Sequence, residues 1–151
     1  MSAPPRVTGD EFLRLIHATI PASTGARLIV EDMAEGRAVI RLEGDPLHQR
    51  AGGTVSGPTI MMLADTALYA AVLSTIGLEP LAVTTDLSFH FLKRPALRDL
   101  VADARVLKKG RKLLVGDVII RSDGAPEAVA HAVGTYAVPD TSDKTGKPDR
   151  A

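Results

Sequence analysis

A single charged side chain stands in the longest apolar stretch of the chain. Asp65 is the one acidic or basic residue between Pro58 and Leu78. A carboxylate buried without a partner is costly, so it needs a hydrogen-bond donor, a proton or a chemical role. Perturbed carboxylates gather in functional clefts, although structural networks also produce them. Asp65 is therefore a candidate for acid–base or nucleophilic chemistry, and the alternative is that it reaches solvent or binds a backbone amide.

A glycine-rich segment leads into this apolar stretch. Residues 52–58 read Gly-Gly-Thr-Val-Ser-Gly-Pro. The free amides and the dipole at a helix N-terminus attract negative charge, including an oxyanion that develops on a substrate carbonyl. Gly57 would let a substrate approach the backbone closely. The segment lacks the Lys-Ser/Thr ending of a phosphate-binding loop. It predicts either an oxyanion site or a simple tight turn.

The apolar stretch itself predicts a helix that starts at Pro58 and stops at Gly77. Proline is favoured at the first helical position, and glycine is favoured just past the last one. Apolar residues from Ile60 to Ile76 cover every face of this helix. A helix that is apolar all round is buried all round, so we expect the rest of the chain to wrap it completely.

The remaining segments predict a sheet as the wrapping layer. A short helix, capped by Thr8 or Asp10 and ended by Pro21, opens the chain. Alternating apolar residues separated by turn residues then indicate strands over residues 26–31, 36–42, 81–92, 99–108, 112–121 and 128–138. Strands at this spacing without intervening helices favour an antiparallel sheet. The expected fold class is α+β, with an antiparallel sheet curled around a long central helix: a short helix, a hairpin, the buried helix and a meander.

We divide the chain into three parts. Residues 1–25 are expected to form a helical segment that packs on the domain, and residues 26–139 the domain itself. Residues 140–151 form a charged tail without apolar periodicity, which we expect to be disordered. Within the domain, residues 43–57 make a glycine-rich connection of a length that is usually functional.

Composition excludes several classes of function. The 151 residues include no cysteine, which rules out a disulfide framework, a thiolate metal site and a cysteine nucleophile. The 18 basic residues balance the 18 acidic ones and aromatic residues are few, so we expect no nucleic-acid partner. The four histidines show no metal-ligand spacing, and we expect no metal. Because neither a signal peptide nor a membrane span is indicated, we expect a cytoplasmic protein without membrane contact.

The residues around Asp65 resemble a known family. Residues 48–67, together with 82–89 and 91–95, are similar to the PaaI-like (phenylacetate-pathway type) hotdog-fold acyl-CoA thioesterases. The family pattern is an Asn, a Gly and a His-Gly-Gly, followed by Leu-x-Asp-x-Ala on the central helix. Residues 63–67 fit this pattern. The resemblance spans roughly residues 26–139 and implies a sheet wrapped around the helix, dimers joined edge to edge and usually tetramers.

The sequence also departs from the family pattern. Gly53 fits it, but Arg50 stands in place of the Asn, and Ser56-Gly57-Pro58 stands in place of His-Gly-Gly. By resemblance, the amide of Gly57 serves as the oxyanion donor. The departures remove the His and Asn side chains that orient substrate in the family.

The resemblance implies roles for further residues. The Asp65 carboxylate acts on water or on the thioester, and the Thr84 hydroxyl helps to hold the water. The residues expected to contact the substrate are Arg50, Ser56, His48, Thr85 and Tyr69. The basic turn expected to bind coenzyme A is Lys109, Gly110, Arg111 and Lys112, unless it is a solvated hairpin tip. We expect no cofactor other than the coenzyme A that is part of the substrate.

The spacing of two of these residues predicts a site shared between subunits. Gly57 and Asp65 are eight residues apart, which is about 12 Å along a helix at about 1.5 Å per residue. One thioester carbon does not reach both within hydrogen-bond distance. If both residues act, they must come from two chains whose central helices run antiparallel at a dimer interface, and a monomer should be inactive.

Three functions follow from these expectations. The leading one is hydrolysis of an acyl or aryl-acyl coenzyme A thioester by a homodimer, or a dimer of dimers. The second is a hotdog hydratase or dehydratase, although those enzymes usually pair an Asp with a His and the matching position here is Ser56. The third is a hotdog module that binds acyl-CoA without catalysis, which Arg50 and Ser56 favour. The sequence leaves open the acyl group and whether Asp65 is a base or a nucleophile.

Overall fold

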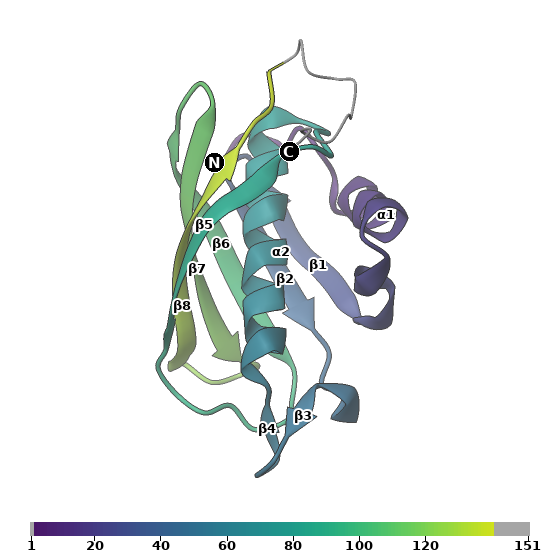
Figure 1. Ribbon diagram of the computed structural model, residues 1–151, viewed down its shortest axis with the longest axis vertical. Coiled ribbons are helices and arrows are strands. Elements are labelled where there is room, and N and C mark those ends of the chain that lie inside the picture. The colour runs from purple at the N-terminus through teal and green to yellow at the C-terminus, as the bar shows by residue number, and fades with distance from the viewer. Residues whose placement is uncertain (1, 141–151) are drawn as a thin grey trace, which may run out of the picture.

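The computed structural model describes residues 2–140 and consists of one long helix held by a sheet (Figure 1). Most of the expected charged tail, residues 141–151, lies outside the described residues. In chain order the elements are α1 (Gly9–Thr19), η1 (Pro21–Gly25), β1 (Leu28–Ala34), β2 (Arg37–Leu42), η2 (Pro46–His48), β3 (Gln49–Arg50), β4 (Thr54–Val55), α2 (Gly57–Ile76), β5 (Val83–Phe91), β6 (Leu100–Lys109), β7 (Leu113–Ser122) and β8 (Ala128–Ala137).

The sheet confirms the expected α+β class and the hotdog fold. Six antiparallel strands lie in the order β1-β2-β6-β7-β8-β5 and curl around α2 (Figure 1). The hairpin and the β6–β7–β8 meander match the expectation from the sequence. The expected place of β5 in that meander is wrong, because β6 is already paired on both sides by β2 and β7. β5 pairs instead with β8 and becomes an edge strand of the sheet.

Two glycines let the sheet approach the helix closely. A Cβ atom at Gly116 on β7 would lie 2.4 Å from the Leu68 side chain, and one at Gly134 on β8 would lie 2.7 Å from it. Both distances are far inside van der Waals contact, so neither position has room for a side chain. Leu68 is fully buried between the two strands as a result.

Both ends of α2 are where the sequence places them. The helix begins at Gly57 with proline in its first turn, and Ser56 is its N-cap residue without a side-chain capping bond. It ends before Gly77, which adopts φ +95° and donates its N–H to the Leu73 carbonyl. That left-handed backbone favours glycine.

One face of α2 stays uncovered within the chain, so the expectation of complete burial is wrong for a single copy. Met61 is 43 % exposed and Pro58 is also exposed, whereas Met62, Asp65 and Thr66 are half-buried. Residues at this spacing share one side of a helix. The rest of α2 is a buried core helix, although by length and composition alone it could cross a membrane.

The N-terminal segment packs on the edge of this core. Thr8 and Glu11 form a reciprocal capping box that begins α1. Phe12 and Ile16 are buried, and the Phe12 ring meets the ring of Tyr69 edge-on at 5.7 Å. After α1 the chain turns directly into η1, which the sequence pattern had not indicated.

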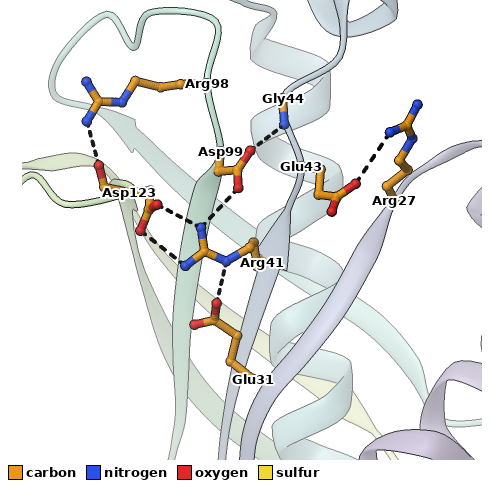
Figure 2. A network of polar contacts seen from close by, with 8 residues as sticks. All are labelled: Arg27, Glu31, Arg41, Glu43, Gly44, Arg98, Asp99 and Asp123. Atoms are coloured by element: carbon orange, nitrogen blue, oxygen red, sulfur yellow. Dashed lines mark hydrogen bonds and ion pairs between the residues drawn. The ribbon is translucent and has the colours of Figure 1, made fainter.

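A charged network ties four segments together at one end of the sheet. The Arg41 guanidinium on β2 donates to Glu31 on β1, to Asp99 at the start of β6 and to Asp123 in the β7–β8 turn (Figure 2). The distances to Asp99 and Asp123 are both 3.1 Å. Asp99 also accepts the backbone N–H of Gly44 at 2.8 Å. Arg41 thus links strands that are distant in sequence.

Candidate active site

Asp65 is held by two neutral hydroxyl groups. Thr84 Oγ1 and the Tyr136 hydroxyl each donate to Asp65 Oδ1 at 2.7 Å. Among the described residues, no donor or cation contacts the other oxygen, Oδ2. The carboxylate is therefore fixed through one oxygen and leaves the second available for a reacting group.

The strand register explains why these two hydroxyls meet one oxygen. Thr84 on β5 and Tyr136 on β8 are direct cross-strand partners. Side chains of such a pair point to the same face of a sheet, here the face that packs on α2. The register of β5 then shifts at Thr85.

Tyr136 is a site residue that the sequence analysis missed. Burial and the charge of Asp65 raise the pKa of its phenol, so the hydroxyl remains a donor at neutral pH. It is buried on a strand whose other buried residues are Val129, two alanines and a glycine. A buried tyrosine usually needs a hydrogen-bond partner, and this was the available signal. Identifying Asp65 as that partner required the fold.

A cavity of about 260 Å³ lies beside Asp65. Its walls come from α2, β5, β8 and the N-terminal segment, and the lining residues are Ile16, Ile20, Ala22, Ser23, Met62, Asp65, Thr66, Tyr69, Ala82, Val83, Thr84 and Tyr136. The expected site residues Asp65, Thr84 and Tyr69 therefore share one cavity. The Tyr69 and Tyr136 rings are nearly parallel, with centroids 5.6 Å apart.

A second hollow, of about 400 Å³, lies at the N-terminal end of α2. Its lining residues are Arg50, Thr54, Val55, Gly57, Ile60, Phe91, Leu92, Lys93, Arg94 and Pro95. The hollow thus brings together the expected site residues Arg50 and Gly57. Lys93 and Arg94 add positive charge that the sequence analysis had not assigned to a site, and Lys93 binds Glu127 at 2.5 Å.

Ser56 and His48 lie at the same end of the helix. The Ser56 hydroxyl is 2.8 Å from Thr59 Oγ1, which is 3.5 Å from His48 Nδ1. Because Ser56 does not cap α2, no side chain at this cap occupies the amides of the first helical turn. Pro58 has no N–H and the Ile60 N–H donates to the Ser56 carbonyl at 3.2 Å, so the N–H groups of Gly57 and Thr59 are the ones available to an anion or to a polarised carbonyl oxygen.

The remaining expected site residues lie outside both hollows. The Thr85 hydroxyl is exposed and donates to the Thr135 carbonyl at 3.2 Å. The turn that contains Lys109, Gly110, Arg111 and Lys112 joins β6 to β7 at the opposite end of the molecule from the β3–β4 hairpin (Figure 1). The Gly110 N–H closes this turn on the Leu113 carbonyl at 2.8 Å. Substrate contact by these residues stays a prediction.

Within one chain, Gly57 and Asp65 do not face the same space. The cavity and the hollow share no lining residue, which agrees with about 12 Å of helix between the two positions. Over residues 2–140, no group of three or more His, Asp or Glu side chains could hold a metal ion. The chemistry available is that of a carboxylate, its two hydroxyl donors and a set of helix-start amides.

Comparison with known proteins shows which family this chain resembles. Residues 52–129 match the family model of the thioesterase superfamily. The crystal structure of a candidate thioesterase from Silicibacter sp. TM1040 is 38% identical, with a TM-score of 0.81, and the match covers 92% of this chain and 96% of that one. A Halobacterium salinarum protein named as a candidate esterase is 32% identical over 123 residues, covering 72% of this chain and 78% of the relative.

The PaaI resemblance is also confirmed. The phenylacetic acid degradation protein PaaI from Thermus thermophilus, solved as a mutant, is 25% identical. Its TM-score is 0.70, and the match covers 79% of this chain and 99% of that chain. The chain therefore belongs to the thioesterase superfamily and has the hotdog fold of its PaaI-like members.

Proposed function

We propose that this protein hydrolyses acyl-coenzyme A thioesters in active sites that two copies of the chain build together. The observation that carries the proposal is the Asp65 carboxylate, which two hydroxyls hold through one oxygen at the wall of an apolar cavity. A thioesterase needs a group that acts on water or on the thioester carbon. Within the part of the chain that the structure describes, Asp65 is the one charged residue that lines this cavity.

The exposed surface beside Asp65 supports the proposal that two copies share the site. The uncovered face of α2 continues onto the edge strand β5, where Val83 is 57% exposed and Phe91 is 53% exposed. An exposed apolar face next to an unpaired strand edge is suited to a second copy of the chain. A twofold axis here would make the two α2 helices antiparallel and bring Gly57 of one copy toward Asp65 of the other.

The reaction then needs few parts. The Gly57 amide donates to the thioester carbonyl oxygen and stabilises the charge that develops on it. In the base route, Asp65 Oδ2 takes a proton from water while the water oxygen attacks the carbonyl carbon. The carbon–sulfur bond breaks, coenzyme A leaves as a thiolate and takes up a proton, and the acid is released. In the nucleophile route, Oδ2 attacks the carbon first, and the carbon–sulfur bond breaks to release the coenzyme A thiolate. Water then hydrolyses the resulting anhydride to the acid and the free Asp65 carboxylate.

The coenzyme A part of the proposal rests on charge and on the family. Its phosphates require cations, and the exposed turn with Lys109, Arg111 and Lys112 supplies three. A fold neighbour from Streptococcus pneumoniae, 22% identical and with a TM-score of 0.72, was solved with coenzyme A. The match covers 87% of this chain and 97% of that one. A dimer of dimers and a cytoplasmic location remain predictions.

The direct test follows thiol release from a panel of acyl-CoA and aryl-acyl-CoA esters. The chain has no cysteine, so a thiol-reactive dye reports only liberated coenzyme A. We expect Asp65→Asn to lower kcat by roughly 10²- to 10⁴-fold, as for loss of a general base, with the oligomer intact. Unchanged turnover in Asp65→Asn would contradict the role of Asp65.

The second candidate function is binding of acyl-CoA without catalysis. The replacement of the family's Asn and His by Arg50 and Ser56 favours it. A binding module would show no thiol release from any ester, yet acyl-CoA would raise its melting temperature by mass action. The same panel therefore separates the two functions.

A further inference from the structure

Like Tyr136, the N-terminal wall of the cavity beside Asp65 lies outside the region that the family model matches. Ile16, Ile20, Ala22 and Ser23 belong to the end of α1 and to η1, and all four line the cavity. The family match begins only at residue 52. This N-terminal wall is therefore a feature of the present chain that the match itself does not describe.

The N-terminal wall is firmly built. The Ile20 N–H donates to the Ile16 carbonyl at 2.7 Å, and the Ser23 N–H donates to the Ile20 carbonyl at 2.9 Å. The Ser23 hydroxyl donates to the Ile16 carbonyl at 3.0 Å. Ile16 is buried, whereas Ile20 is 43% exposed and Ala22 is also exposed. Ile20 and Ala22 therefore form the rim of the cavity on a fixed backbone.

Apart from Asp65 Oδ2, the polar side chains of the lining are already engaged in hydrogen bonds. Thr66 Oγ1 donates to the Met62 carbonyl at 2.8 Å, and the Tyr69 hydroxyl lies 3.4 Å from the carbonyl oxygens of Glu79 and Pro80. Among residues 2–140 of one chain, no Lys or Arg lines the cavity, and its one charge is Asp65. In the part of the site that one chain supplies, an acyl group with its own carboxylate would face that charge without a counter-ion, so this lining favours neutral apolar groups.

The size of the cavity limits the acyl group further. A dry apolar cavity of about 150 Å³ accepts benzene. The present cavity of about 260 Å³ has room for one aromatic ring with a short linker, or for a medium-length alkyl chain. A long fatty chain would have to pass the rim at Ile20 and Ala22.

We propose that the N-terminal wall sets the acyl selectivity of the enzyme, with Ile20 and Ala22 as the specificity-determining residues. The pocket takes neutral, apolar acyl groups of one aromatic ring or medium chain length. This inference rests on the proposed thioesterase function.

The test measures kcat/KM for straight-chain esters from acetyl-CoA to palmitoyl-CoA, with benzoyl-CoA and succinyl-CoA added. Ile20→Ala opens the rim and is expected to raise the palmitoyl-to-acetyl ratio of kcat/KM by about tenfold. Ala22→Phe narrows the rim and is expected to lower kcat/KM for octanoyl-CoA and benzoyl-CoA by about tenfold, with acetyl-CoA nearly unchanged. Succinyl-CoA should be a far poorer substrate than butyryl-CoA.

Two matched variants control for general effects. Ile29→Ala removes an equally exposed isoleucine from β1, and Ala18→Phe adds a ring to the exposed side of α1, both away from the cavity. The proposal is overturned if these variants shift the chain-length profile as much, or if Ile20→Ala and Ala22→Phe change all esters equally. Efficient succinyl-CoA hydrolysis would also overturn it.

A failure of the proposed function would look different. If the wild-type protein releases no thiol from any ester, the proposed hydrolysis is refuted. The inference that the N-terminal wall selects the acyl group is still open to test. In that case the inference is tested by binding: the dissociation constants of S-alkyl coenzyme A thioethers are measured by calorimetry. Ile20→Ala must favour longer alkyl groups and Ala22→Phe must weaken the medium ones; equal affinities in wild type and both variants would overturn the inference.

Discussion

Arg41 and Asp65 are both charged, partly buried side chains, and they lie in opposite kinds of surroundings. Arg41 faces three carboxylates, so its charge is compensated several times over (Figure 2). Among the residues that the structure describes, the polar side chains that contact Asp65 are the neutral hydroxyls of Thr84 and Tyr136. The first arrangement fixes strands to one another, whereas the second orients a carboxylate and leaves its charge without a paired cation. A charge that is oriented but not paired by a cation is available for chemistry.

The role given to the surroundings of Asp65 is tested most strongly by removing the two hydroxyls that orient its carboxylate. Thr84→Val and Tyr136→Phe should each lower kcat by about tenfold, and the double variant by about a hundredfold, because the carboxylate loses its fixed position. Thiol release measures the effect. Ser88→Ala, an exposed hydroxyl on the same strand, is the matched control. Full activity in the double variant would show that the carboxylate does not need these donors.

At Arg41 the expected loss is of stability and not of activity. Arg41→Met removes the cation that three carboxylates share, and we expect the free energy of unfolding to fall by about 1–2 kcal/mol. Urea denaturation measures this change. Arg27→Met is the control, because the Arg27 side chain is 70% exposed and its guanidinium lies 3.6 Å from the Glu43 carboxylate. A fall in kcat without a fall in stability would contradict the assignment.

At acid pH, the free energies of unfolding of wild type and Arg41→Met should become equal. The Arg41 guanidinium lowers the pKa of Asp123, so this carboxylate is more acidic in the folded state than in the unfolded chain. Stability from a lowered pKa is present above the unfolded value, near 4, and is lost as the pH falls through the folded value. The two unfolding curves should converge below about pH 4. A constant gap down to pH 3 would show that packing, not charge, is what Arg41 contributes.

These contrasts also show which parts of the molecule the sequence could predict. The ends of α2 depend on Pro58 and Gly77, which act locally, and the sequence placed both. Asp65 stood out because its neighbours along the chain are apolar. Tyr136 became recognisable only once β8 was paired with β5, and that pairing depends on β6 being enclosed by β2 and β7. The residues of η1 line the cavity because the folded chain places them beside α2, and no local sequence pattern predicts that contact.

The smallest expected effect appears at high pH. Burial and the charge of Asp65 raise the pKa of Tyr136 above its ordinary value near 10. A raised pKa contributes stability below the unfolded value, and this stability is lost as the pH rises through the folded value. Wild type should therefore lose stability more steeply than Tyr136→Phe above about pH 10, as measured by urea denaturation at each pH. Parallel curves would contradict a buried, neutral phenol at Asp65.

The central claim is that Gly57 of one copy works with Asp65 of another. Gly57→Pro removes the amide donor at a helical position that tolerates proline, and Gly57→Ala keeps the amide in a site with room for a methyl group. We expect Gly57→Ala to stay active, and Gly57→Pro and Asp65→Asn each to be nearly inactive.

The most direct measurement unfolds Gly57→Pro and Asp65→Asn together in equal amounts, refolds them and follows thiol release. Random pairing makes half of the dimers mixed, and each mixed dimer regains one of its two shared sites, so about a quarter of wild-type activity should return. Refolding each variant alone provides the baseline. No recovery in the mixture, although mixed dimers form, would mean that each site is built from one chain and would contradict the account.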